Sequence, residues 1–317
     1  MNSTPHPGDR VDARAVGGWD GRPPRESGVR TDVASDNARL AATQIDLSTV
    51  RRNSTPVRRA FVRGLEEPRS ASPLLSLYRG GRSGVVPIKV YLALLWRCSA
   101  APFSTQAPAR AWATLLDLED PGGVGARRVR DAISKLAARQ LITTESSRGE
   151  LTSVTLLRDD GTGRTYSIPS SAYVKADSGR RGKKVLDQHR YFKINSDLWT
   201  TGILQVLSGP ALVMLLILLS EGGDRGDRIW FSTELFKERY GISPATRAKG
   251  IRELVERGLV TVDREALPDR PGGKVFERLR YRDVYTLTGA ALVDEEDRAA
   301  RRSAGDLRFR PQVLADS

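Results

Sequence analysis

Cationic and hydrogen-bonding side chains recur at helical spacing in one segment of the chain, residues 244–257. Thr246, Lys249 and Arg252 follow one another at intervals of three residues, so on a helix they would lie along one side. Side chains of these types donate hydrogen bonds to phosphate oxygens and to the edges of bases. The chemistry that this spacing predicts is recognition of a nucleic acid by a helix that enters the major groove of a duplex.

A pair of helices joined by a tight turn must position these side chains. Ser232 or Thr233 can cap a short first helix, Gly241 can end it, and Ser243 with Pro244 can begin a second helix. The apolar residues of the second helix predict its inner face: Ala248, Ile251, Leu254 and Val255. The opposite face is expected to carry Thr246, Lys249, Glu253 and Glu256, with Arg252 at its edge. The alternative is a solvated helix pair in another kind of small domain.

The same pattern occurs a second time, earlier in the chain. Residues 133–142 align on residues 251–260 without a gap. Two further matches lie upstream of these segments: 103–105 with 231–233, and 87–96 with 210–219. We therefore expect a duplicated unit of roughly one hundred residues, which is the size of a single domain.

The overall charge agrees with a polyanionic partner. The chain has 317 residues, enough for about two domains, and its 51 Lys and Arg residues against 38 Asp and Glu give a formal net charge of +13. This balance favours nucleic acid or an anionic membrane surface. The apolar run 203–219 is interrupted by Ser208–Pro210 and predicts a buried helix rather than a membrane span. Because the N-terminus does not resemble a signal peptide, the expected location is the cytoplasm.

Residue types that support catalysis or metal binding are scarce. The only histidines are His6 and His189 and the only cysteine is Cys98, so neither a zinc site nor an internal disulfide is expected. The segment 272–274 lacks the leading glycine of a phosphate-binding loop. We expect a protein that is not an enzyme and has no metal or cofactor; a metal-dependent nuclease that uses scattered Asp and Glu is the alternative.

Composition divides the chain into five parts. Residues 1–70 are rich in Arg, Gly and Pro and poor in apolar residues, so we expect a disordered arm. A first domain is expected over residues 71–169, a basic linker over 170–189, a second domain over 190–289 and a charged tail over 290–317.

The first domain repeats the features of the second. A helix over 126–139 corresponds to the one described above, and its outward cations are expected to be Arg127, Arg128 and Lys135. Strands over 141–144 and 151–157 should form a hairpin with Arg148 at its tip.

Two further groups of cations could contact phosphates. The linker carries Arg180, Arg181, Lys183 and Lys184, which would lie between two DNA-bound domains or form a solvated spacer. After a strand over 260–264, a long turn carries Arg270 and Lys274. On the return strand, over 275–287, alternation should place Arg278, Arg280 and Arg282 on one face and Leu279 and Tyr281 on the other. We expect these three arginines to form a phosphate-binding stripe; a half-exposed sheet is the alternative.

Helices followed by a twisted hairpin, present twice, resemble the tandem winged-helix DNA-binding proteins. The second copy carries the pattern I-x-x-L-x-x-x-G-L-[IV] in Ile251, Leu254, Gly258, Leu259 and Val260. The first copy repeats it in Ile133, Leu136, Leu141 and Ile142, with Gln140 in the place of the glycine. The resemblance covers roughly residues 72–288. It implies a mainly α fold with small β-wings, of the α+β class.

The resemblance includes bacterial transcription regulators and the plasmid replication initiators that use two winged helices. It implies double-stranded DNA as the partner, with a host protein or a second copy of the chain as a further possibility. Three functions stay open. The chain is expected to be a sequence-specific transcription regulator; the alternatives are an initiator of plasmid or mobile-element replication and a non-catalytic protein-assembly module.

Overall fold

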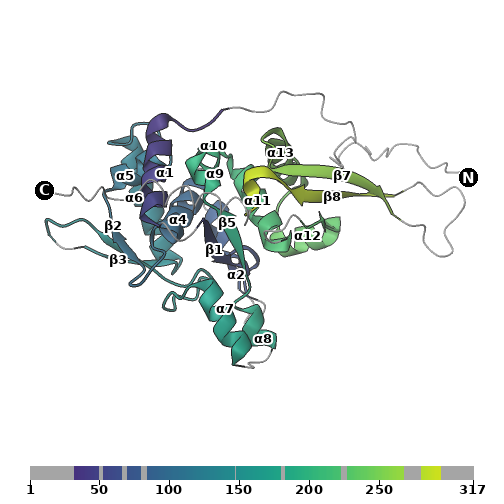
Figure 1. Ribbon diagram of the computed structural model, residues 1–317, viewed down its shortest axis with the longest axis horizontal. Coiled ribbons are helices and arrows are strands. Elements are labelled where there is room, and N and C mark those ends of the chain that lie inside the picture. Colours follow the sequence, from purple (N-terminus) through teal and green to yellow (C-terminus); the bar gives the residue numbers. More distant parts are fainter. Residues whose placement is uncertain are drawn as a thin grey trace, which may run out of the picture.

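The computed structural model describes residues 32–49, 53–65, 70–79, 84–146, 148–179, 183–222, 227–267 and 280–293, with the backbone alone for residues 183 and 184. Helices predominate, and the strands form three small antiparallel sheets (Figure 1). The expected α+β class is therefore confirmed. None of the helices in these ranges has the length and apolar character that crossing a membrane would require.

Nine elements follow one another in what we call the first unit, residues 54–156. They are β1 (Ser54–Arg58), α2 (Arg59–Arg63), α3 (Pro73–Tyr78), α4 (Val85–Arg97), β2 (Ser104–Gln106), α5 (Ala109–Leu115), α6 (Val124–Ala138), β3 (Ile142–Glu145) and β4 (Ser153–Leu156). Strands β2, β4 and β3 form one antiparallel sheet, with β4 in the middle.

The second unit, residues 191–287, has the same nine types of element in the same order. They are β5 (Tyr191–Asn195), α9 (Asp197–Thr200), α10 (Ile203–Val206), α11 (Gly209–Gly222), β6 (Ile229–Trp230), α12 (Thr233–Tyr240), α13 (Pro244–Glu256), β7 (Val260–Ala266) and β8 (Tyr281–Leu287). Strands β6, β8 and β7 form a sheet with β8 in the middle, which is the strand order of the first unit. The internal repeat found in the sequence is thus a repeat of topology.

The long apolar helices α4 and α11 are at the centre of the molecule. In α11 every residue from Ala211 to Ser220 is buried, which explains why its sequence lacks a polar face. The prediction of a buried helix in the apolar run 203–219 is therefore confirmed for α11, whereas residues 203–206 form the separate short helix α10. One continuous cluster of buried side chains includes residues of both units, so the two units share a core.

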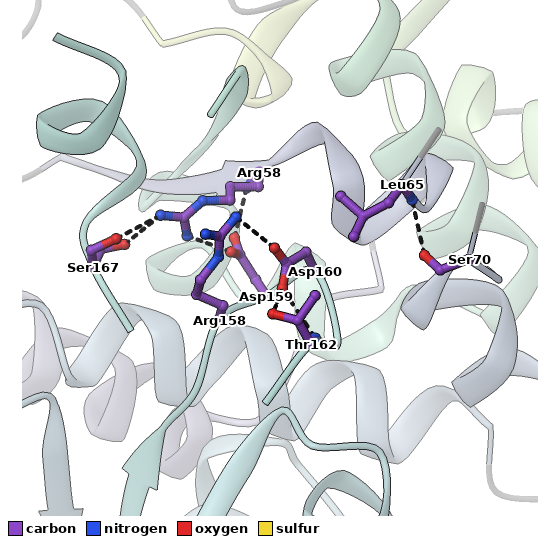
Figure 2. A network of polar contacts seen from close by, with 8 residues as sticks. All are labelled: Arg58, Leu65, Ser70, Arg158, Asp159, Asp160, Thr162 and Ser167. Carbon is purple, nitrogen blue, oxygen red and sulfur yellow. Dashed lines mark hydrogen bonds and ion pairs between the residues drawn. The ribbon is translucent and has the colours of Figure 1, made fainter. Parts of the chain in front are cut away.

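The first unit holds β1 through a fully buried ion pair (Figure 2). Nη1 of Arg58, the last residue of β1, lies 2.5 Å from Oδ1 of Asp159, and both side chains are 0% exposed. The backbone N–H of Arg58 donates to Oδ2 of Asp159 at 2.7 Å, and Nη2 donates to the carbonyl oxygen of Ser167 at 2.8 Å. Because a buried charge is tolerated only when it is paired and hydrogen-bonded, this network fixes β1 against the loop that follows β4.

The prediction of a disordered arm over residues 1–70 is wrong for much of its second half. Helix α1 (Asp36–Ser48) contacts α5 and α9 and therefore bridges the two units. Its buried residues are Ala38 and Ala42, whose small side chains permit close packing. Because alanine is only weakly hydrophobic, this segment looked polar when it was judged by composition. The elements β1 and α2 also belong to this stretch, and residues 1–31 lie outside the described residues.

The expected basic linker is also helical where it is described. Helix α7 (Pro169–Ser178) begins with a proline at its first turn, and α8 (Lys183–Asp187) follows it. An edge-to-face contact between Tyr173 and Tyr191 attaches α7 to β5. Arg180 and Arg181, and the side chains of Lys183 and Lys184, lie outside the described residues. Beyond β8, Ala291 and Val293 are buried, so packing continues past the expected boundary at residue 289.

Candidate nucleic-acid interface

Helix α13 presents two cationic side chains to solvent. Oγ of Ser243 caps the helix by accepting a hydrogen bond from the backbone N–H of Thr246 at 3.1 Å, and Pro244 occupies the first turn, as the sequence predicted. Lys249 and Arg252 are exposed on its outer side. Thr246 is half-buried, and its hydroxyl lies 2.9 Å from the Ser243 hydroxyl. The cations are therefore available to a ligand, whereas the threonine hydroxyl already has a partner.

A close approach of α13 to α11 determines which side faces outward. Gly250 lies against the start of α11, where an added Cβ would be 2.4 Å from the carbonyl oxygen of Pro210 and 2.7 Å from Cγ of Met214. Only a residue without a side chain fits this contact. Ile251 and Leu254 are buried beside it, so the predicted apolar side of the helix is the inner one.

The expectation that Glu253 lies on the outer face is wrong. Its side chain is buried, and the residue is 5% exposed. It accepts a hydrogen bond from the backbone N–H of Ser208 at 3.0 Å and another from the Ser208 hydroxyl, and it lies 3.5 Å from Nε of Arg257. The contact through Gly250 turns positions 250, 253, 254 and 257 toward the core, since these recur at helical spacing. The burial of this carboxylate leaves the outer face of α13 more cationic than the sequence suggested.

Helix α6 is the counterpart of α13 in the first unit. The carboxylate of Asp120 caps its start by accepting hydrogen bonds from the backbone N–H groups of Gly123 at 3.1 Å and Val124 at 2.9 Å. Its buried side is formed by small and aliphatic residues: Ala126, Val129, Ala132 and Leu136. The opposite side therefore faces outward.

Of the three cations expected to point outward from α6, only Arg127 is exposed. Arg128 and Lys135 are half-buried at the edges of the helix. Arg130 is exposed on the same side as Arg127 and was missed by the sequence reasoning. The signal was available, because residues three apart lie on one side of a helix.

The first hairpin has the expected form. Strands β3 and β4 pair in antiparallel register from Ile142↔Leu156 to Glu145↔Ser153, next to the C-terminal end of α6. Arg148 lies in the connecting turn and is exposed. The hairpin can therefore present this cation beyond the helix.

One predicted cation of the second hairpin, Arg282, is bound to a carboxylate within the hairpin. Nη2 and Nε of Arg282 donate to Oε2 of Glu265 at 2.9 and 3.1 Å, and the guanidinium lies 4.9 Å from the ring centre of Trp230. These hydrogen bonds, together with the nearby charge of Arg228, lower the pKa of Glu265. Arg282 is thus already paired with a carboxylate on the neighbouring strand, which it shares with Arg228.

The rest of the predicted arginine stripe is described only in part. Arg280 is exposed just before β8, whereas Arg270, Lys274 and Arg278 lie outside the described residues. Alternation was expected to place Tyr281 on the face opposite the arginines, and the structure leaves this side chain exposed. Tyr281 is 46% exposed, and the guanidinium of Arg264 lies 4.7 Å from its ring centre. The hairpin extends beyond the core here, so both of its faces meet solvent.

An arginine within α13 has a positioning role that the sequence did not reveal. The guanidinium of Arg247 lies 4.6 Å from the ring centre of Phe236, 5.4 Å from that of Tyr285 and 5.6 Å from that of Phe231. It also donates to the hydroxyl of Tyr285 at 2.8 Å. Burial raises the pKa of Tyr285, and the charge of Arg247 opposes that rise. Arg247 therefore joins α13 to α12 and β8, which holds the exposed cations in place.

Known proteins give no further guidance to the function of this surface. Comparison of the chain with protein families, with curated proteins and with solved structures found no match.

Proposed function

We propose that this chain binds double-stranded DNA, with α6 and α13 as the recognition helices of two winged-helix domains. Three helices and a three-stranded sheet with the order found here are the parts that a winged helix requires. In such domains the second helix of the helix-turn-helix lies in the major groove and the hairpin reaches the adjacent backbone. The repeat of this arrangement in one chain doubles the surface available for DNA.

The observation that carries the proposal is the charge of the exposed side in both helices. Lys249 and Arg252 on α13, and Arg127 and Arg130 on α6, are exposed to solvent. Glu253, which the sequence placed on the same face as Lys249, is instead buried and accepts a hydrogen bond from Ser208. Cations on a helix that follows a tight turn suit contacts to phosphates and to guanine edges.

The process that we favour is sequence-specific regulation of transcription. Replication initiation is the second candidate, and one observation favours it. The two units share a core, so a single copy of the chain would hold two recognition helices at a fixed separation. An initiator that must bind an array of repeated sites one chain at a time would benefit from such a rigid pair.

Selection from a random duplex library with the purified full-length chain tests the proposal. We expect enrichment of one sequence, and an affinity for it that falls steeply as salt concentration rises, because bound phosphates release counterions. Mapping the enriched sequence to promoters or to arrays of direct repeats would separate regulation from initiation. If no duplex binds even at low salt, the proposal is wrong and the protein-assembly module becomes the better hypothesis.

A further inference from the structure

The first strands of the two units pair with each other across the middle of the molecule. Strands β1 and β5 are antiparallel, and the first residue of each pairs with the last residue of the other: Ser54 with Asn195, and Arg58 with Tyr191. These strands hold the same place in the element order of their units. An antiparallel pair of equivalent strands in this register has a local two-fold axis through its centre, at the Pro56–Lys193 pair.

Contacts between the units are reciprocal, as a two-fold relation requires. Helix α4 of the first unit packs on the short helices of the second: Trp96 stacks on Trp199 of α9 with ring centres 5.6 Å apart. In return, α11 of the second unit contacts α2 and α3 of the first. There the guanidinium of Arg63 on α2 pairs with the carboxylate of Glu221 on α11, with Nε 3.0 Å from Oε1. The interface therefore has the isologous form of a two-fold dimer within a single chain.

Helix α6 packs against α4 of the first unit, and helix α13 packs against α11 of the second. The charges of Arg128 on α6 and of Glu253 and Arg257 on α13 all act on the ammonium group of Lys89, which is buried between the units. The segment before α1 also links the two regions. Nη2 of Arg257, at the end of α13, lies 3.1 Å from Oδ2 of Asp32, and the hydroxyl of Ser35 donates to Oδ1 of Asp117, just after α5, at 2.6 Å.

The two hairpins extend away from the junction between the units (Figure 1). The hairpin of β3 and β4 and that of β7 and β8 extend toward opposite ends of the molecule (Figure 1). Had the units been arranged in tandem, in the same orientation, both hairpins would extend in the same direction. The observed arrangement is the one expected of a two-fold pair.

We infer that the DNA target of this chain consists of two unlike half-sites read in opposite directions, with the two hairpins at its outer ends. The inference rests on the proposed function. A two-fold protein matches the two-fold symmetry of duplex backbone geometry, so its equivalent helices enter major grooves about one helical turn, or a multiple of it, apart.

The half-sites must differ because the outward side chains of the two helices differ. The alignment of residue 133 on residue 251 shows that the exposed cations stand at different positions of the two helices. Arg127 and Arg130 of α6 correspond to Ala245 and Ala248 of α13, whereas Lys249 and Arg252 of α13 correspond to Asp131 and Ser134 of α6. Arginine favours bidentate contact with guanine, whereas the single ammonium of lysine imposes less geometry. The target is therefore expected to have two-fold backbone geometry without being a palindrome in sequence.

Cleavage of DNA from labelled hairpins tests the inference. Glu150→Cys, in the turn of the first hairpin, and Ala266→Cys, at the end of β7, replace exposed residues and would each carry a tethered iron chelate that cleaves nearby DNA. The native Cys98 is buried, and burial raises the pKa of its thiol to about 12, so labelling should be confined to the introduced cysteines. Each labelled chain is first checked for unchanged affinity on the selected duplex.

We expect the two labels to cleave at opposite ends of the bound site. Cleavage by one label at an end and by the other at the centre would indicate a tandem arrangement and would overturn the inference while leaving DNA binding intact. Absence of binding by the unlabelled chain would overturn both the proposed function and the inference. A duplex without the selected sequence serves as the control for cleavage that does not depend on the site.

Discussion

Nζ of Lys89, on α4 of the first unit, lies 2.6 Å from the backbone carbonyl oxygen of Gln205 and 2.8 Å from that of Leu207, at the end of α10 in the second unit. The ammonium group thus caps the end of a helix in the other unit, where unpaired carbonyls need a donor. Lys89 is 6% exposed, and burial lowers its pKa from 10.5 to about 8, with the charge of Glu253 opposing the shift.

Replacement of Lys89 should change how stability depends on pH. Its folded pKa lies below the ordinary value, so between about pH 8 and 10.5 the unfolded chain binds more protons at this site than the folded one. The contribution of Lys89 to the free energy of unfolding should therefore rise with pH across this window, by up to about 3 kcal/mol. Denaturant unfolding of the wild type and of Lys89→Met at both ends of the window measures it. Lys249→Met, at an exposed position, is the control, and an equal pH dependence in all three proteins would contradict the assignment.

A methyl group at position 250 should destabilise the second unit. Gly250→Ala would place its Cβ 2.4 Å from the backbone oxygen of Pro210, so α13 would have to move away from α11. Overpacking of this kind costs roughly 1 to 3 kcal/mol. Gly122→Ala is a matched control, because an added Cβ there meets nothing within 4 Å. Thermal unfolding of both variants measures the difference, and equal midpoints would show that the helices separate without cost.

Local sequence signals accounted for the parts of the fold that depend on neighbours along the chain. The serine cap and proline of α13, the glycine after α12 and the turn of the first hairpin each act within a few residues, so the elements could be predicted. The apolar sequence of α11 likewise predicted that this helix is buried. The outward positions of Lys249, Arg252 and Arg127 followed from helical periodicity.

Contacts between distant residues could not be predicted in this way. The bond from Ser208 to Glu253, the aromatic rings around Arg247 and the pairing of β1 with β5 join positions that no spacing rule connects. Helix α1 was missed for a different reason. Its buried side needs only alanines, because the neighbouring helices supply most of the apolar surface. Tertiary contacts of this kind decide which charged side chains are exposed. The structure was therefore needed to tell which of the predicted cations are available to bind a ligand.

Removal of the lysine on the outer side of α13 should affect specificity. If Lys249 contacts a base edge, Lys249→Ala should weaken binding to the selected site by about 1 to 3 kcal/mol and binding to random duplex by less. Fluorescence anisotropy on both duplexes measures the two losses. Lys175→Ala, at an exposed position of α7, removes the same charge away from α13 and is the control. An equal loss on both duplexes would assign Lys249 to the phosphate backbone instead.

The role of the first unit depends on the two exposed arginines of α6. The double substitution Arg127→Ala and Arg130→Ala should reduce affinity for the selected site and lower the slope of log affinity against log salt by up to about 2. Arg128→Ala should have a smaller effect, because that side chain is half-buried. If the double variant keeps full affinity, the first unit does not bind DNA and the two-fold arrangement of half-sites fails with it.

Arg282 of the second hairpin and Arg148 of the first should differ in how much they contribute to the salt dependence of DNA binding. Arg282 already donates two hydrogen bonds to Glu265, so a phosphate would have to displace a carboxylate to reach it. Arg148 lies in the exposed turn of the first hairpin, so a phosphate that approaches it does not compete with Glu265. We expect Arg148→Ala to lower the salt slope by about 1 and Arg282→Ala to leave it nearly unchanged. In the variant Glu265→Gln the carboxylate charge is lost, and Arg282 should then contribute to the slope. If Arg282→Ala alone flattens the slope as much as Arg148→Ala does, the guanidinium leaves Glu265 when DNA binds, and the phosphate-binding stripe expected from the sequence would regain support.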